Sequence, residues 1–351
     1  MFDKAIALAK ELVMDAIKNK KPLQIVGGNS KSFYGNKLCE LPKLSTTNFD
    51  GIIQYDPGEL VIQVGAGTNL VEVTKVLESE GQMLAFEPPS FDGNATIGGV
   101  IASGLSGSRR PYAGSARDFV LGVDIIDGKA QHLSFGGQVM KNVAGYDVSR
   151  LLTASMGCLG LITEVSLKVL PKPAAERTQR IEIDRFSAHK LMRELQFSSA
   201  LLSASAYFNE QLYVRFSGME TSVIKASKAF GGEQVNGIIW SEIDNLQLFD
   251  IKDDLWRVSL LPGSKLFLKE AGLIDWGGGQ RWIVDPKNPV RETFLDSGEA
   301  GHITLVRLGS KSCDQDRFQA LSPYLLKIHQ GLKAQFDPAG ILNPYKIYKQ
   351  F

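Results

Sequence analysis

The sequence predicts an α+β protein of two domains. With 351 residues, the chain is longer than the roughly 150 residues of one ordinary domain. In its first half, strand patterns outnumber helix patterns, and the connections are too short for a regular series of βαβ units. After Pro171 and Pro173 the pattern becomes more variable, which indicates a domain boundary near residue 174.

The first half begins with a predicted helix. Over residues 1–20, apolar side chains recur at helical spacing with lysines between them, which predicts an amphipathic helix rather than a signal peptide. A second helix is expected over 68–81. Thr68 or Asn69 would be its N-cap, and Gly81 would end it.

Predicted strands make up most of the remaining first half. The stretch 22–36 reads as an apolar strand that breaks into a glycine-rich loop. Residues 51–67 predict a hairpin that turns at 56–58, where proline presets φ. Residues 118–137 predict another, and we expect Asp127-Gly128 to form its type I′ turn. The last elements of this half are a helix at 146–155 and a strand at 160–173.

The second half is expected to form a smaller α+β domain. Its clearest feature is a hairpin at 203–218 that turns at Asn209-Glu210. The other expected elements are a helix near 221–230 and strands at 255–260, 280–285 and 302–308. A final helix should end near Phe336 and lead into a turn-rich tail. The predicted division is therefore 1–174, 175–320 and 321–351, and no repeat is visible in the sequence.

Charge and cysteine content argue against several classes of protein. The 39 basic and 38 acidic residues leave no general positive field for nucleic acid or an anionic membrane. No uncharged run reaches the roughly 18 residues of a membrane span, so we expect a cytoplasmic protein. Cys39, Cys158 and Cys313 lie far apart and outside any CxxC motif. This spacing argues against a disulfide framework, a zinc site or an iron–sulfur cluster held by this chain alone.

Glycine-bearing loops at 27–35, 93–107 and 157–160 indicate a binding site in the first half. Glycine permits positive φ and lets the backbone approach a bulky ligand with its N–H groups outward, as a pyrophosphate requires. Any one loop alone could be an ordinary tight turn. The segment 64–70 fails the GxGxxG pattern of NAD-binding folds because Leu70 takes the place of the third glycine. The chain also lacks the GK[ST] triplet of a P-loop.

Longer strings resemble a known family. They include "IVGGNSKSFYGN", "VGAGTNLVEVTKVLESEGQ", "EPPSFDGNATIGGVIASGLSGSRRPYAGSARDFVLGVDIIDG" and "FDPAGILNP". These strings resemble the FAD-binding domain of the vanillyl-alcohol oxidase/PCMH flavoproteins. "FGGQVMKNVAGYDVSRL" and "LIDWGGGQRW" are similar, more closely, to FAD-binding subunits of bacterial glycolate oxidases. The resemblance implies a PCMH-type FAD-binding domain of two α+β subdomains, a small α+β cap domain, and a tail that returns to the FAD domain.

The same resemblance implies which residues hold FAD. Those wrapping the pyrophosphate would be Gly27, Gly28, Asn29, Ser30 and Lys31. Those lining the diphosphate, the ribityl chain and the flavin ring would be Pro88, Ala95, Thr96, Ile97, Gly98, Gly99, Ser103 and Gly104. Those beside the adenosine half would be Gly157, Gly160, Leu161 and Ile162, with Asn343 near the ring. Because 27–35 and 93–117 contain no histidine or cysteine, we predict non-covalent FAD.

Candidate catalytic residues are few. Oxidation of a hydroxy acid needs a base for the hydroxyl proton, and His302 is our candidate, although it could instead be a satisfied or surface histidine. Arg109 and Arg110 are candidates to hold an anionic substrate. Alternatively, one faces solvent and the other pairs with Asp118 or another carboxylate. We expect Arg117 and Asp118 to form an ion pair. The four histidines show no HxH or HxxxH spacing, so we expect no metal site.

The resemblance implies an FAD-dependent 2-hydroxy-acid oxidoreductase. The chain would be the FAD-binding subunit of a multi-subunit glycolate dehydrogenase or oxidase that forms glyoxylate and passes electrons to a partner subunit. Two alternatives stay open: an electron-transfer or architectural flavin subunit without its own turnover, and an independent D-lactate-type dehydrogenase. The implied partners are a larger flavin subunit and an iron–sulfur subunit, in a complex that could lie against the inner membrane.

Overall fold

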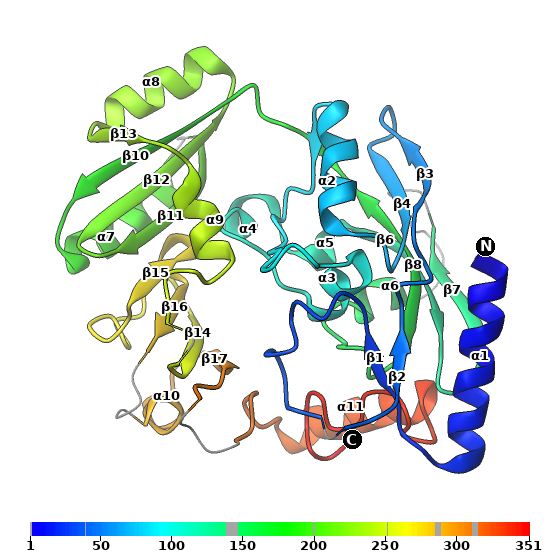
Figure 1. Ribbon diagram of the computed structural model, residues 1–351. Coiled ribbons are helices and arrows are strands. Elements are labelled where there is room, and N and C mark those ends of the chain that lie inside the picture. The colour runs from blue at the N-terminus through cyan, green and yellow to red at the C-terminus, as the bar shows by residue number, and fades with distance from the viewer. Residues whose placement is uncertain are drawn as a thin grey trace. The chain divides into compact units, whose positions relative to one another are not determined.

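The chain folds into two compact units in a computed structural model (Figure 1). The residues described are 2–38, 40–137, 147–198, 201–250, 252–284, 289–310 and 315–351. Unit 1 consists of Met1–Leu105, Ser115–Pro171 and Ala320–Phe351. Unit 2 consists of Ser106–Gly114 and Lys172–Gln319. The C-terminal segment is thus part of the same unit as the N-terminal half, and the short segment Ser106–Gly114 is part of unit 2.

A five-stranded antiparallel sheet is the framework of unit 1. Its order is β3-β4-β8-β6-β7, with strands at Ile52–Asp56, Val61–Gly65, Leu161–Lys168, Val120–Ile126 and His132–Gly136. The hairpins predicted at 51–67 and 118–137 and the strand predicted at 160–173 are therefore confirmed. Two small sheets complete the unit: β1 (Gln24–Val26) with β2 (Lys43–Ser45) in parallel, and β5 (Gln82–Met83) with β9 (Leu170–Pro171).

The helices of unit 1 include both helices expected near the N-terminus. They are α1 (Phe2–Asn19), α2 (Leu70–Ser79), α3 (Ile97–Ser103), α5 (Ala116–Phe119), α6 (Val148–Leu151) and α11 (Pro323–Phe336). The buried face of α1, with Ala9 and Val13, packs against Phe49 and Leu342 in one apolar cluster. Asn69 is the N-cap of α2, because its side chain accepts the N–H of Val71 at 2.8 Å.

The expectation of an open loop across 93–107 is wrong, because α3 occupies its centre. The hydroxyl of Thr96 accepts the N–H of Gly99 at 3.3 Å and so caps the helix. Ile97, Val100 and Ile101 are at most 1% exposed and provide its buried face. Burial of this apolar face outweighs the low helix propensity of the two glycines, which made the segment read as a loop.

The β6–β7 hairpin forms, but the predicted type I′ turn at Asp127-Gly128 is wrong. The carboxylate of Asp127 closes a longer loop by accepting the N–H groups of Lys129 at 2.9 Å and Gln131 at 2.8 Å. Positive φ falls on Ala130, at 59°, and not on Gly128. A Cβ on Gly128 would lie 2.6 Å from the Cα of Asp337. Glycine is therefore needed at 128 so that the end of α11 can approach.

Unit 2 is built on one eight-stranded antiparallel sheet, and the two halves of this sheet connect their strands in the same order. The first half contains β10 (Ala175–Glu182), α7 (Arg185–Gln196), β11 (Leu202–Phe208), β12 (Gln211–Gly218), α8 (Glu220–Phe230) and β13 (Glu233–Val235). Its strand order, β13-β10-β12-β11, is that of a ferredoxin-like β-α-β-β-α-β unit. The predicted hairpin turn is confirmed, with positive φ at both Asn209 (49°) and Glu210 (59°).

The second half of this sheet repeats the connectivity in the order β15-β16-β14-β17. Its elements are β14 (Leu255–Leu260), β15 (Leu273–Asp275), β16 (Gln280–Ile283), α10 (Val290–Ser297) and β17 (Gly301–Arg307). Turns over 261–272 stand where the first helix of the repeat would be. The halves join through β11 and β15. Unit 2 also contains α4 (Arg110–Ala113), α9 (Ile238–Asp244) and the 3₁₀ turn η1 (Trp276–Gly278).

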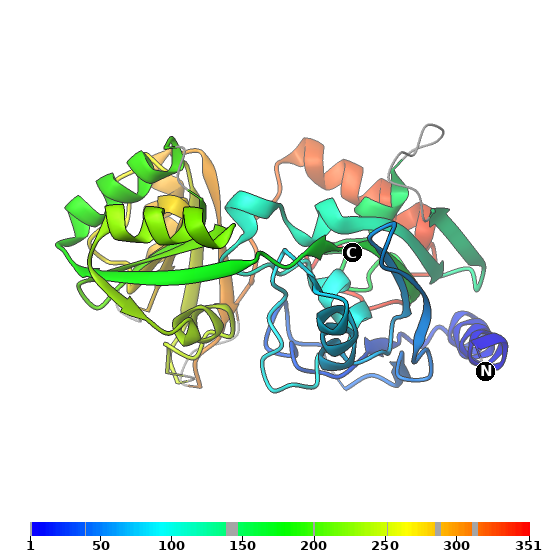
Figure 2. The same cartoon turned by 90° about the horizontal axis from the view of Figure 1, so that it is seen from above.

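One face of this sheet is covered by helices. The helices α7 and α8 are drawn in green in Figure 2. Met192 of α7 and Val223 of α8 pack with Val214 and Phe216 in one apolar cluster. α10 covers the same face of the second half, where Phe294 contacts the cluster of Val258 and Ile303. The side chains that alternate with these lie on the opposite face. That second face carries the polar residues of unit 2 described below.

Candidate functional site

A cavity in unit 1 brings the three predicted glycine-bearing segments together. It is open to solvent and has a volume of about 130 Å³. Of the predicted cofactor residues, its lining includes Gly27, Gly28, Asn29, Ser30, Lys31, Thr96, Gly98, Gly99, Ser103, Gly157, Gly160, Ile162 and Asn343. Its lining does not include Pro88, Ala95, Ile97, Gly104 or Leu161.

The turn that follows β1 provides a set of backbone donors. A Cβ on Gly28 would lie 1.5 Å from the carbonyl oxygen of Asn94, so only glycine fits this close approach. Asn29 has a positive φ of 58°. In the part of the chain that the structure describes, no hydrogen bond uses the N–H groups of Gly28, Asn29 or Ser30. Consecutive unpaired N–H groups of this kind form an anion-binding nest.

Lys31 adds a partly desolvated positive charge to this turn. Its Nζ lies 3.2 Å from the Oγ of Ser30 and 5.5 Å from the centroid of the Phe91 ring. Burial lowers the pKa of Lys31 to about 8, against the opposing effect of Asp92. At neutral pH the ammonium is still mostly protonated. Because it is poorly hydrated, a bound anion would stabilise it strongly.

The hydroxyls of Thr46 and Ser103 also line the cavity. Thr46 follows β2, and its buried Oγ1 has no hydrogen-bond partner among the described residues. A buried polar atom of this kind normally finds a partner, so an ordered polar ligand fits the site. Ser103 lies at the end of α3. Sequence reasoning missed Thr46 because it becomes a wall residue only when β2 pairs with β1, for which the sequence gives no local signal.

The C-terminal tail forms another part of the wall. Asn343 Nδ2 donates to the carbonyl oxygen of Met156 at 2.6 Å, and its Oδ1 accepts the N–H of Ile25 at 2.7 Å. One amide therefore ties the tail to β1 and to the loop before β8. Gly157, next in that loop, has a φ of 73°, and a Cβ there would lie 2.7 Å from Asn343 Nδ2.

A row of polar side chains crosses the second face of the unit 2 sheet. Paired residues in register are Asp275 with Gln280, Gln280 with Ser259, and Ser259 with His302. Gln280 Nε2 donates to both oxygens of Asp275, at 3.0 and 3.1 Å. Burial raises the pKa of Asp275 to about 7, although Gln280 and nearby arginines favour the ionised carboxylate.

His302, the predicted base, lies at the end of this row. Desolvation by its surroundings, together with the charges of Arg257 and Arg110, lowers the pKa of His302 below its ordinary value. The imidazole is therefore neutral at pH 7, the form that can accept a proton. Its catalytic role stays a prediction.

The two predicted arginines have different surroundings in unit 2. Arg109 forms an ion pair with Glu176, and its side chain is 8% exposed. Arg110 lies over the ring of Trp276, in the motif 273–282, with 4.3 Å between guanidinium carbon and ring centroid. Their roles toward substrate also stay predictions.

The predicted Arg117–Asp118 ion pair does not form. Asp118 instead caps α5, where it accepts the N–H and the hydroxyl of Ser115, each at 2.8 Å. The Asp118 carboxylate therefore binds the helix N-terminus in a capping box. The basic residue beside it in the sequence had suggested an ion pair instead.

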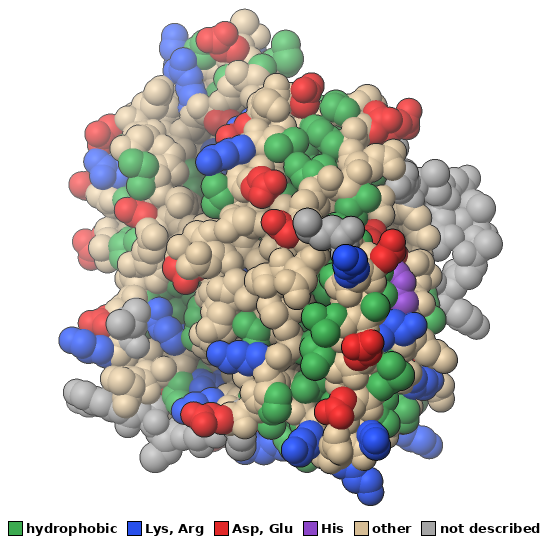
Figure 3. Space-filling model, turned by 45° about the vertical axis from the view of Figure 1, so that its right-hand side comes forward, with side chains coloured by type: hydrophobic (Ala, Val, Ile, Leu, Met, Phe, Trp, Pro, Cys, Tyr) green, Lys and Arg blue, Asp and Glu red, His purple; other side chains and the backbone are tan. Residues whose placement is uncertain are grey.

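Figure 3 shows both signs of charge interspersed over the face it presents, as the near-neutral composition predicts. Within the described ranges, no helix is long and apolar enough to cross a bilayer. The same ranges contain no group of three or more His, Cys, Asp or Glu side chains placed to hold a metal ion.

Cys158 is buried and unoxidised. Cys39, Cys313 and residues 138–146 of the "FGGQVMKNVAGYDVSRL" string lie outside the described residues.

Comparison with known proteins identifies the family. A family model described as "FAD binding domain" matches residues 6–136. The chain is 43% identical to the glycolate oxidase subunit GlcE of Escherichia coli over 97% of its own length and 96% of that protein. It is 32% identical to a D-lactate dehydrogenase of Anaerostipes hadrus, over 87% of the chain and 79% of that protein.

A solved structure shares the fold. p-Cresol methylhydroxylase with substrate bound superposes with a TM-score of 0.74 at 15% identity, over 99% of this chain and 88% of that one. The α+β architecture with a PCMH-type FAD domain is thereby confirmed. The cavity lined by the turn after β1, the α3 segment and the tail lies in unit 1, which contains most of the matched residues. The cofactor of the chain is FAD. The chain belongs to the FAD-binding flavoprotein family that includes the glycolate oxidase subunit GlcE.

Proposed function

We propose that the chain is the FAD-binding subunit of a multi-subunit 2-hydroxy-acid oxidoreductase that converts glycolate to glyoxylate. The observation that carries this proposal is the full-length similarity to a glycolate oxidase subunit, combined with a cavity whose donors suit a dinucleotide. The similarity to a D-lactate dehydrogenase supports the wider class of substrate, a short 2-hydroxy acid.

The unit 1 cavity holds the cofactor through its own backbone and side chains. The free N–H groups of Gly28, Asn29 and Ser30, together with the Lys31 ammonium, bind the diphosphate. Thr46 and Asn343 offer polar groups to the rest of the cofactor. FAD, when bound, supplies the two-electron acceptor that oxidation of an alcohol needs. The described lining contains no cysteine or histidine, which supports non-covalent binding.

In this proposal, residues of the polar face of unit 2 bind the substrate and accept its proton. Oxidation of glycolate removes the hydroxyl proton and a hydride equivalent from the adjacent carbon. His302 accepts the proton, and its lowered pKa keeps it neutral for that task. Arg110, whose guanidinium lies over the Trp276 ring, binds the carboxylate. Arg257, whose charge acts on His302, lies on the same face and assists in binding the carboxylate.

A second candidate function is electron transfer or an architectural role within the complex, without turnover by this chain. It is favoured by the name of the similar protein, which is a subunit. Under either reading, the partners are a larger flavin subunit and an iron–sulfur subunit, and the complex is cytoplasmic or peripheral to the inner membrane. A third candidate is an independent D-lactate-type dehydrogenase, supported by the similarity to the enzyme of that name.

The test is an anaerobic assay of the purified, FAD-loaded chain with a dye acceptor and either glycolate or D-lactate. Turnover of glycolate by the chain alone supports a complete active site. Turnover only after addition of partner subunits supports the electron-transfer role. Preference for D-lactate without any partner supports the third candidate. A chain that turns over neither acid, alone or in the complex, contradicts the proposal.

A further inference from the structure

Helix α11 buries a lysine and exposes apolar side chains. Lys333 is 6% exposed, whereas Tyr324 on the same helix is 74% exposed. The Lys333 ammonium makes three hydrogen bonds: to Asp337 Oδ2 at 2.7 Å, and to the carbonyl oxygens of Cys158 and Leu342 at 2.8 Å each. All three donors of the ammonium are therefore used.

These three acceptors belong to three different segments of unit 1. Asp337 ends α11, Cys158 lies in the loop before β8, and Leu342 lies in the tail. The Asp337 carboxylate also accepts the N–H groups of Ile341 at 3.1 Å and Leu342 at 2.8 Å. A buried charge pair is costly unless every polar atom has a partner, and this pair meets that condition.

Two of the three acceptors are chain neighbours of the cavity wall. Cys158 follows Met156 and Gly157 in the chain, and Leu342 precedes Asn343. Met156, Gly157 and Asn343 line the cavity, whereas Lys333 does not. A second link joins the same segments, because the Cys158 thiol donates to the carbonyl oxygen of Asn343 at 3.4 Å. Burial raises the pKa of this thiol to about 11, so it stays a donor at neutral pH.

We infer that Lys333 is a positioning residue for FAD. Its ammonium holds Cys158 and Leu342 in place, so that Gly157 and Asn343 keep their positions in the cavity wall. Lys333 acts on the cofactor only through these residues. The inference concerns cofactor affinity alone and is independent of which hydroxy acid the protein oxidises.

The decisive variant is the full-length double substitution K333M/D337N. The single substitution K333M leaves a buried carboxylate without its cation and can prevent folding. In the double variant, the single amide oxygen of residue 337 keeps one of the two tail N–H bonds, which the carboxylate accepts on different oxygens. What is lost is the other N–H bond and the link from α11 to Cys158 and Leu342. K327M, at an exposed lysine of the same helix, is the matched control.

The measurement is the dissociation constant of FAD, from the quenching of flavin fluorescence on titration with the apoprotein. For K333M/D337N we expect an increase of about tenfold or more, the size seen when groups that orient a direct ligand contact are removed. K327M should match the parent. A folded double variant whose dissociation constant is within twofold of the parent overturns the inference, even if its thermal midpoint has fallen.

Two further measurements separate positioning from general support. In an N343A background, the double substitution should weaken FAD binding less, because Asn343, one of the two wall residues through which Lys333 acts, has lost its side chain. Equal effects in both backgrounds overturn the inference. In the unsubstituted chain, FAD should slow hydrogen exchange at the Ile341 and Leu342 amides. Unchanged exchange there at saturating FAD also overturns it, whether or not any variant folds.

Discussion

The guanidinium of Arg110 lies over the ring of Trp276, 4.3 Å from its centroid. Its chain neighbour Arg109 instead forms an ion pair with Glu176 and is nearly buried. Although burial opposes it, Arg109 is the main cause that holds the pKa of Glu176 below its ordinary value. Two adjacent cations thus have separate partners, and their substitutions should have separable effects.

R110A should raise the KM for glycolate and lower kcat/KM by roughly 10- to 100-fold, the loss expected for one charged hydrogen bond to a carboxylate. R109A should mainly lower the thermal midpoint, because Glu176 loses the nearer of its two cations, the other being Arg215 at 3.7 Å. Steady-state kinetics and thermal unfolding of both variants check this. An R110A enzyme with an unchanged KM contradicts carboxylate binding by Arg110.

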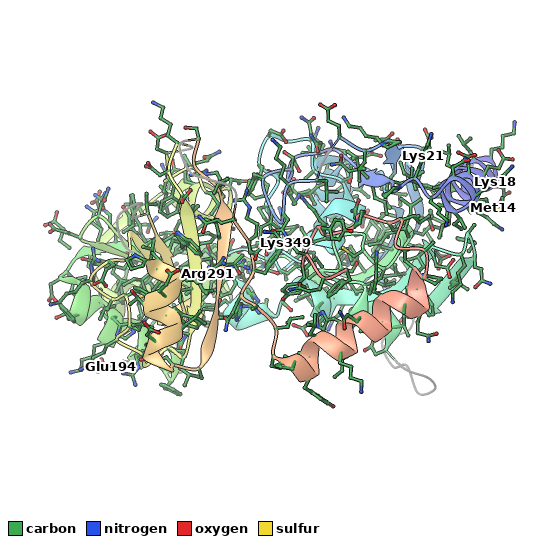
Figure 4. The ribbon with its side chains drawn as sticks, turned by 90° about the horizontal axis from the view of Figure 1, so that it is seen from below. Met14, Lys18, Lys21, Glu194, Arg291 and Lys349 are labelled. Atoms are coloured by element: carbon green, nitrogen blue, oxygen red, sulfur yellow. The ribbon has the colours of Figure 1, made fainter. Side chains whose placement is uncertain are left out.

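FAD binding should weaken at alkaline pH through Lys31. The free protein holds this lysine at a pKa of about 8, and the anionic diphosphate favours the protonated form. Binding is therefore strongest below pH 8, and the dissociation constant should rise about tenfold between pH 7 and 9. K31M should bind weakly with no such pH dependence. Lys18, in the last turn of α1 and labelled in Figure 4, gives a control, K18M, that keeps the dependence.

G28A should lose FAD, because a Cβ at this position would lie 1.5 Å from the Asn94 oxygen and the turn would have to move. We expect a dissociation constant raised more than tenfold, read from the flavin content of purified protein. G331A on α11, where nothing lies within 4 Å of the new Cβ, should bind FAD normally and gain about 0.5–1 kcal/mol in stability. Full flavin occupancy in G28A would show that the turn is not a close ligand contact.

H302Q should lower kcat for glycolate by roughly 10²- to 10⁴-fold, as expected for loss of a general base. In the parent, kcat/KM should rise with pH through a pKa below 6.5 and then level off, because the imidazole must be neutral. The pH–rate profile should lose this limb in the variant. An unaltered limb would assign the base to another group.

Stability should also depend on the Asp275 carboxyl. Its pKa is about 7 in the folded chain against 3.8 in the reference state. Between about pH 4 and 7 the folded form keeps a proton that the unfolded form has released. The contribution of this carboxyl to the free energy of unfolding therefore falls as pH rises through this window and is flat above it. D275N should remove this contribution, as measured by denaturant unfolding of parent and variant at several pH values. A D275N variant whose stability changes with pH as that of the parent does contradicts the assignment.

The sequence predicted correctly those elements that depend on residues close together in the chain. The hairpin turn at Asn209-Glu210 was found because these two polar residues separate two runs of strand-forming residues. Helix α3 was missed because its driving force is burial of Ile97 and Ile101 against the rest of unit 1, which local propensity does not contain. Lys333 gave no signal at all, since a lysine on a predicted surface helix is ordinarily solvated and its acceptors lie far away in the chain.

The repeated connectivity of unit 2 was equally hidden. The two halves share strand order but not sequence pattern, and turns over 261–272 replace one helix. Side chains such as Phe267 and Leu268 fill the space that the helix would cover. Packing requires side chains of the right total volume, but many different sequences can supply that volume. The structural repeat is therefore not visible as a sequence repeat.

The eight-stranded sheet of unit 2 offers little to a strand of another chain. One edge, β13, is only three residues long, and Glu233 on it pairs with Arg180. At the other edge, β17 already bonds to a chain segment: Leu305 N–H donates to the Arg317 carbonyl oxygen at 2.7 Å, and Ile303 N–H to the Gln319 side chain at 3.3 Å. Short, charged or covered edges resist intermolecular β-pairing. Association of this unit with other subunits therefore depends on side-chain surfaces, which can be selective, and not on generic backbone pairing, which leads to aggregation.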